Sequence, residues 1–312
     1  MKKKISILTG PTASGKSSIA IYLAKTFNCE IVSCDSAQIY KKMDIRTAKP
    51  NKAELLEVRH HMIDICEISD SYSVADYKKD ASRIFDDIWK RGSRVLVTGG
   101  TGLYIDALVH DMEFLEEDKA IGKYYDNYLK EYGKQALYNL LYQRDIDAAL
   151  STHPNNTKRV ARYLSLLHNF SGTLAEYQKA RLRINPDLDF DIYVLDPDRP
   201  FLYEKINSRV DQMIEDGLIE EVEDIIKDES LIETNAMQAI GYKEIVAYLK
   251  GQTSLDEAVD LLKQNTRNYA KRQVTWFKRY IKLEDSDRVK VKYIKRDEDT
   301  SLEDILKEIS FD

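Results

Sequence analysis

Three features of the sequence predict an α/β fold, in which a parallel sheet is flanked by helices and carries an all-helical insertion domain. An apolar run at residues 5–9 has the length of a strand and meets a loop with the pattern Gly-x-x-x-x-Gly-Lys-Ser, and a helical pattern follows it. Apolar runs at 30–35 and 94–98 are also of strand length and end at an acidic residue and at a glycine-rich turn. From about residue 115, helical patterns follow one another without strand-like runs between them.

The loop after the first run is predicted to bind phosphate. Gly10 and Gly15 let the backbone turn so that successive N–H groups point inward, and a helix beginning near Lys16 adds its positive end. Lys16 would neutralise a phosphate, and the Ser17 hydroxyl would hold Mg²⁺. The strand, loop and helix predict a P-loop NTPase-like sheet with a diphosphate or triphosphate ligand. The predicted diphosphate- or nucleotide-binding residues are Gly10, Pro11, Thr12, Ala13, Ser14, Gly15, Lys16 and Ser17.

The composition is that of an ordinary soluble protein. The chain has 312 residues, 43% of them hydrophobic and 32% charged, which allows one large or two modest domains. No run approaches the roughly 18 apolar residues of a membrane span and no signal peptide is evident, so we expect a cytoplasmic protein without membrane contact. A net charge of −6 argues against indiscriminate coating of nucleic acid. The three cysteines show no zinc-ligand spacing.

Two further predicted strands place polar groups at the phosphate-binding edge of the sheet. Asp35 ends the 30–35 strand, and ligands of open α/β sheets lie outside the carboxyl ends of the strands. Thr101 follows the 94–98 strand within a glycine-rich turn. An acidic residue at a strand end often only caps a turn or helix, and a glycine-rich turn often has no function beyond turning the chain. Local evidence leaves these structural roles open as alternatives to ligand binding. Because no Asp directly follows the 94–98 strand, the sequence favours group transfer over nucleotide hydrolysis.

Two later helices carry basic faces. In the first, cations three and four residues apart share one face, and in the second, at about 265–280, a basic stripe is backed by aromatic residues. The first set is Lys158, Arg159 and Arg162, and the second is Arg267, Lys271 and Arg272. A solvated helix face is the alternative meaning of either set. Cations backed by aromatic residues are typical of a surface that meets nucleic-acid phosphates.

These patterns divide the chain into three parts. Residues 1–114 and 199–283 are predicted to form the P-loop catalytic core with C-terminal helices, and 115–198 a helical insertion domain. An apolar run at 191–196 is expected to return the chain to the main sheet. Residues 284–312 are predicted to be a charged C-terminal tail with one short amphipathic helix.

Seven motifs complete the pattern. They are Gly10–Ser17, Asp35–Tyr40, Thr47–Pro50, His60–Asp64, Gly99–Tyr104, Ala239–Glu244 and Lys271–Trp276. In this order they resemble the tRNA dimethylallyltransferase family, over roughly residues 4 to 280. The resemblance implies transfer of a dimethylallyl group from dimethylallyl diphosphate, rather than use of ATP, to the N6 amine of the adenosine 3′ of the anticodon, with Mg²⁺ as cofactor.

The resemblance also implies a role for each of several residues. Lys16 and Arg209 would bind the leaving diphosphate, Ser17 would hold Mg²⁺, Thr101 would lie near the bridging oxygen, and Asp35 would be the general base. The insertion and the 265–280 helix would bind the anticodon stem-loop of tRNA, and a monomer is expected. The implied tRNA contacts are Asp35, Ser36, Ala37, Gln38, Thr101, Lys123, Lys158, Arg159, Val160, Ala161, Arg162, Arg267, Lys271 and Arg272.

Three rival functions remain open. A small-molecule kinase on the same fold would bind ATP at the loop and use the insertion as a lid. An isopentenyltransferase acting on free adenine nucleotides would share the chemistry, although it would not need the long insertion. A nucleotide-dependent RNA-binding protein without catalysis would keep its function when Asp35 is replaced by Ala.

Overall fold

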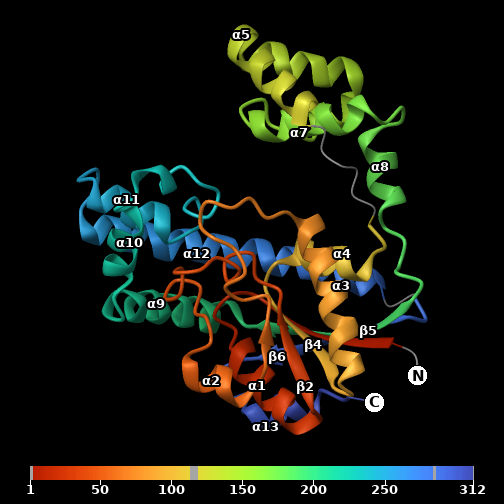
Figure 1. Ribbon diagram of the computed structural model, residues 1–312, viewed down its shortest axis with the longest axis vertical. Helices are drawn as coiled ribbons and strands as arrows, with labels where there is room; N and C mark the ends of the chain where they lie inside the picture. The colour runs from red at the N-terminus through yellow and green to blue at the C-terminus, as the bar shows by residue number, and fades with distance from the viewer. Residues whose placement is uncertain (1–2, 113–118, 284–285, 312) are drawn as a thin grey trace. The chain divides into compact units, whose positions relative to one another are not determined.

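The strands of the structure, a computed structural model that describes residues 3–112, 119–283 and 286–311, form one parallel sheet (Figure 1). Within the described residues the strand order is β3-β2-β4-β1-β5-β6. The strands are β1 (Lys3–Thr9), β2 (Cys29–Ser33), β3 (His60–His61), β4 (Arg94–Gly99), β5 (Leu188–Pro197) and β6 (Val289–Arg296). This arrangement confirms the predicted parallel α/β sheet.

The register of the strands gathers three loops at one edge of the sheet. Thr9, the last residue of β1, pairs with Gly99 at the end of β4, and Ser33 at the end of β2 pairs with Thr98. The phosphate loop, the loop after β2 and the glycine-rich turn after β4 therefore leave the sheet side by side. This edge is where ligands of open parallel sheets bind.

Helices flank the sheet (Figure 1). α1 (Lys16–Phe27) and α13 (Leu302–Lys307) pack in one apolar cluster with the strands, and α3 (Val74–Lys90) contacts β4 and α4 (Gly102–Val109). In α1 the buried side chains recur at the spacing of one helical face. The other helices of this unit are α2 (Lys52–Glu57), α9 (Arg199–Glu215), α10 (Leu218–Ile226), η1 (Glu229–Leu231), α11 (Tyr242–Leu249), α12 (Leu255–Phe277) and η2 (Lys278–Leu283).

The chain divides into two compact units. The sheet and the helices named above belong to the first, Met1–Val109 with Asp187–Asp312, and the second is His110–Pro186. Helices of the second unit pack around their own apolar core, which confirms the all-helical insertion. They are α5 (Lys119–Arg144), α6 (Ile146–Leu150), α7 (Thr157–His168) and α8 (Leu174–Ala180). No helix among the described residues is long and apolar enough to cross a membrane.

The observed boundary of the helical unit differs from the predicted insertion, 115–198. The last part of that range contains β5, which pairs with β1 from Leu188 to Val194 and so belongs to the sheet. Its predicted start, with the acidic stretch 116–118, lies outside the described residues. The apolar run at 191–196 is confirmed as a returning strand.

The prediction that 284–312 is a charged tail is wrong for the described part of that range. β6 pairs with β5 from Phe190 to Pro197, and α13 packs on α1. The physical reason is a set of apolar side chains that are at most 5% exposed. They are Val289, Ile294, Ile305 and Ile309. The three isoleucines among them pack in the same apolar core as the sheet. The predicted short helix is confirmed as α13.

Candidate active site

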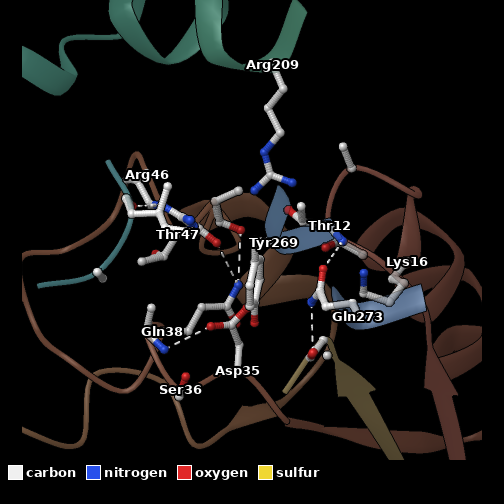
Figure 2. A pocket seen from close by; sticks show the side chains of 18 of the residues that line it. Thr12, Lys16, Asp35, Ser36, Gln38, Arg46, Thr47, Arg209, Tyr269 and Gln273 are labelled. Atoms are coloured by element: carbon white, nitrogen blue, oxygen red, sulfur yellow. Dashed lines mark hydrogen bonds between the residues drawn. The ribbon is translucent and has the colours of Figure 1, made fainter. Parts of the chain in front are cut away.

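A cavity of about 640 Å³ lies at the carboxyl edge of the sheet, in the unit that contains the sheet (Figure 2). The phosphate loop, the loop after β2 and the turn after β4 form part of its wall, together with residues of α9 and α12. It therefore brings together segments that lie up to 261 residues apart, as in the contact of Thr12 with Gln273. The predicted site residues that line it are Thr12, Ala13, Gly15, Lys16, Ser17, Asp35, Ser36, Ala37, Gln38, Arg209 and Arg272.

The phosphate loop has the backbone conformation that anion binding requires. Gly15 lies at the N-cap of α1 with a φ of 80°, in the left-handed region that favours glycine. Because Gly15 has no side chain, the first N–H groups of α1 are left for an anion, which the helix dipole also favours. The Lys16 ammonium donates to the carbonyls of Gly10, at 3.0 Å, and Pro11, at 2.7 Å.

Positive charge dominates the cavity. Burial and repulsion from Arg209 lower the pKa of Lys16 to about 7. Burial, with repulsion from Arg46, lowers the pKa of Arg209 to about 10. The lining cations are Lys16, Arg46, Arg209, Lys243 and Arg272, against the carboxylates Asp35 and Glu54. Crowded cations of lowered pKa favour a bound polyanion such as a diphosphate.

Asp35 lies in the same cavity, on a loop that is held to the turn after β4. Its Oδ1 accepts the N–H of Ala37 at 2.9 Å. Thr101 lies beside the cavity and is not among its lining residues, but its hydroxyl accepts the N–H of Ser36 at 3.0 Å and its own N–H donates to Cys34 at 3.1 Å. These bonds fix the carboxylate relative to the glycine-rich turn.

The two motifs between β2 and α3 have a structural part in this site. The Lys49 ammonium, with only 5% of its side chain exposed, contacts Asp44 at 2.6 Å and Asp64 at 2.5 Å. This joins the Thr47–Pro50 and His60–Asp64 motifs. Gln38, a lining residue, donates to the carbonyl of Thr47 at 3.1 Å. Lys49 thus stabilises the segment that orients Gln38.

Several lining residues were missing from the predicted site, among them Arg46, Tyr269 and Gln273. Figure 2 shows Tyr269 close to Asp35, and burial together with the Asp35 charge raises the pKa of Tyr269 to about 12. The amide of Gln273 donates to the carbonyl of Gly100 at 2.8 Å. The available signal was the Lys271–Trp276 motif, which contains Gln273.

Two predicted cations on α12 lie outside the cavity. Arg267 donates to Asn207 of α9 at 2.6 Å. Lys271 is exposed and lines a more open depression of about 570 Å³, together with Trp276. Arg272 lines both the cavity and this depression.

In the helical unit, the predicted tRNA contacts divide by exposure. Lys123, Lys158, Arg159 and Arg162 are exposed. Val160 is 1% and Ala161 8% exposed, because both side chains pack in the apolar core of this unit. Val160 and Ala161 therefore offer RNA little side-chain surface, whereas the cations of α7 are exposed, and the tRNA contacts of this helix stay predictions.

The cavity residues fit a metal ion that is bound partly by the protein and partly by the phosphate oxygens of a ligand. No cluster of three or more His, Cys, Asp or Glu side chains that could hold a metal occurs among the described residues. Ser17 at the start of α1 lines the cavity. Mg²⁺ is commonly held by one or two protein ligands plus phosphate oxygens, and this loop offers that arrangement.

The fold and this cavity define a P-loop-like α/β enzyme of the group-transfer class. The chain belongs to the IPP transferase family, whose model matches residues 38–280. It is 45% identical over 284 residues to the tRNA dimethylallyltransferase of a Thermoanaerobacter species, covering 90% of each chain. It is 46% identical over 284 residues to the tRNA dimethylallyltransferase of Caldanaerobacter subterraneus, again covering 90% of each.

Solved structures agree with the family assignment. A tRNA isopentenylpyrophosphate transferase from Staphylococcus epidermidis is 37% identical, with a TM-score of 0.69 and coverage of 98% of this chain and 97% of that one. A eukaryotic dimethylallyltransferase acting on tRNA is 27% identical, with a TM-score of 0.76 and coverage of 93% and 74%.

Proposed function

We propose that this chain transfers the dimethylallyl group of dimethylallyl diphosphate to the N6 amine of the adenosine 3′ of the anticodon in tRNA, releasing diphosphate. The observation that carries the proposal is one cavity that combines the phosphate loop, the partly buried cation Arg209 and the carboxylate of Asp35. Its volume of about 640 Å³ lies within the range of small-ligand sites and has room for a base and a five-carbon chain.

At one end of the cavity the chemistry is loss of a diphosphate. The allylic C–O bond breaks and its electron pair leaves with the diphosphate oxygen. Lys16, Arg209 and the N–H groups at the start of α1 stabilise the charge that develops there. Ser17 and the phosphate oxygens would hold Mg²⁺, which neutralises further charge on the leaving group when it is bound.

At the other end, the N6 amine forms the new C–N bond and gives up a proton. Asp35 would accept this proton, and its carboxylate, which lines the cavity and is held by the N–H of Ala37, supports this role. Such general-base help typically contributes about 10²- to 10⁴-fold to the rate. Tyr269 beside Asp35 offers an aromatic wall for the purine, which must leave the anticodon stack to reach the cavity.

Binding of tRNA is assigned to cations on both units. The exposed Lys158, Arg159 and Arg162 of α7 and the exposed Lys271 of α12 are suited to backbone phosphates. Ser36 and Gln38 line the same cavity as Asp35, which supports their contact with the target base.

An acceptor comparison tests the proposal. The protein is incubated with Mg²⁺, labelled dimethylallyl diphosphate and either tRNA, AMP or no acceptor. We expect label in tRNA alone. Label in AMP but not in tRNA would identify an enzyme acting on free nucleotides, and ATP hydrolysis without prenyl transfer would identify a kinase-like protein.

A further inference from the structure

A cation from the C-terminal strand lies against the phosphate loop. Arg296, the last residue of β6, donates a guanidinium hydrogen bond to the carbonyl of Ser14. Its guanidinium also lies over the ring of Phe201, 5.8 Å from the centroid. Arg296 lies outside residues 38–280, which the family model matches. The phosphate loop is therefore held by a strand residue that lies 282 residues from Ser14 in the sequence.

This bond orients the peptide group that begins α1. In a trans peptide the carbonyl of one residue and the N–H of the next point in opposite directions, and the described residues contain no cis peptide. Arg296 holds the Ser14 carbonyl on its own side of the loop, so the Gly15 N–H points to the opposite side. Gly15 and Lys16 are both lining residues of the cavity. A Cβ on Gly15 would overlap the guanidinium, so only glycine allows this approach.

The charge of Arg296 also lacks a local counterpart. Its guanidinium is half-buried, and its Nε is a buried donor with no hydrogen-bond partner. Burial lowers the pKa of Arg296, and no carboxylate among the described residues offsets this effect. A partly buried cation without an anion is costly, and a bound anion relieves that cost. Its field reaches the cavity, since Arg296 contributes to the lowered pKa of Lys16, after burial and Arg209.

We infer that Arg296 is a positioning residue for diphosphate binding, which holds the Ser14 carbonyl so that the Gly15 N–H faces the phosphate and adds its positive charge behind the loop. The inference rests on the proposed function, because it assigns the anion to that same cavity. It gives the C-terminal strand a part in substrate binding rather than in folding alone.

Three variants test the inference: Arg296→Gln, Arg296→Lys and the matched control Lys295→Gln. Lys295 is the preceding residue of β6 and pairs with Asp196, with 77% of its own side chain exposed, so its loss removes one positive charge from the same strand. Each folded variant is titrated with inorganic diphosphate and Mg²⁺ by calorimetry, and KM and kcat are measured separately for dimethylallyl diphosphate and tRNA. Thermal unfolding reports any loss of stability.

Arg296→Gln is expected to weaken diphosphate binding and raise KM for dimethylallyl diphosphate about 10- to 100-fold, the value of a charge-assisted hydrogen bond, with KM for tRNA unchanged. Arg296→Lys should retain part of the affinity, and Lys295→Gln all of it. Unchanged diphosphate affinity in both Arg296 variants would overturn the inference. So would an affinity loss matched by equal increases in both KM values. Failure of the unaltered protein to prenylate tRNA would count against the proposed function instead, because the diphosphate titration needs no acceptor.

Discussion

The side-chain oxygen of Gln273 accepts the backbone N–H of Thr12 at 2.8 Å. The nitrogen of the same amide donates to the carbonyl of Gly100 at 2.8 Å. One side chain of α12, only 5% exposed, therefore fixes the distance between the phosphate loop and the glycine-rich turn after β4. Neither bond is available to a side chain that lacks both a donor and an acceptor.

Replacing Gln273 by Leu should weaken transfer and lower stability. The change leaves the Thr12 N–H and the Gly100 carbonyl without their partner, at a cost of about 1–3 kcal/mol in the free energy of unfolding. We expect kcat/KM for dimethylallyl diphosphate to fall about tenfold or more, as the loop loses its fixed position. Urea unfolding and steady-state kinetics measure the two effects.

Thr275→Ala is the matched control for this variant. Thr275 is exposed on the same helix, and its hydroxyl donates to the Lys271 carbonyl one turn earlier. Its removal should leave both measurements near those of the unaltered protein. Normal kinetics in Gln273→Leu would show that the two hydrogen bonds of Gln273 have no part in catalysis.

Charge removal on α7 should weaken tRNA binding without affecting diphosphate binding. Lys158→Gln combined with Arg162→Gln removes two exposed cations and spares Arg159, which donates to Tyr163 at 2.7 Å. If both cations meet phosphates, the slope of log affinity against log salt should decrease by roughly 1.5. Titration of the protein with tRNA at several salt concentrations gives the slope.

The control for the α7 variant is Arg83→Gln, an exposed arginine on α3 of the other unit. It removes one positive charge and should leave the salt slope unchanged. An unaltered slope in the double α7 variant would mean that this helix face is ordinary solvated surface.

An ionic cluster around the buried carboxylate of Glu30, in β2, predicts a pH-dependent stability. Arg91 binds both oxygens of Glu30, each at 2.8 Å, and Nε2 of His61 lies 2.7 Å from the same carboxylate. Hydrogen bonds from Arg91 lower the pKa of Glu30 from 4.5 to about 2. Because the folded-state pKa is depressed, this stabilisation is present above about pH 4.5 and is lost as the pH falls toward 2.

Glu30→Gln should therefore destabilise the protein by about 1–3 kcal/mol at neutral pH, with a smaller difference below pH 4.5. Urea unfolding at several pH values measures the difference. Glu57→Gln is the control, since Glu57 pairs with Lys25 at the surface and such pairs contribute little. A Glu30→Gln effect that does not change with pH would contradict the assigned pKa shift.

Local sequence patterns were sufficient for most of the sheet and for the phosphate loop. The runs that became β1, β2, β4 and β5 each contain consecutive buried residues, most of them apolar, as strands covered on both faces do. The loop was predictable because glycine, lysine and serine at fixed spacing have defined roles in binding phosphate.

β6 was missed because it is an edge strand. Its sequence, Val289–Arg296, alternates apolar with charged residues, and lysines on an edge strand protect it from further pairing. The same alternation is typical of a charged segment, which is how it was predicted. Only the pairing with the neighbouring strand β5 and the packing on the core distinguish an edge strand from a charged tail.

Gln273 and Arg296 could not be placed from local patterns. Each reaches the phosphate loop from more than 250 residues away in sequence, so its position depends on the packing of the whole unit. The cations of α7 were recognised because helical spacing alone places them on one face. The same spacing did not reveal that Val160 and Ala161 face the core.

The central claim is that one cavity holds the diphosphate and a carboxylate that accepts the proton of the amine. The direct test compares Asp35→Asn with Glu54→Gln, which alters the other carboxylate of the cavity. Transfer of label to tRNA and binding of inorganic diphosphate are measured for both. We predict that Asp35→Asn lowers transfer about 10²- to 10⁴-fold with diphosphate binding intact, while Glu54→Gln retains both. Normal transfer by Asp35→Asn, or loss of its diphosphate binding, would contradict the account.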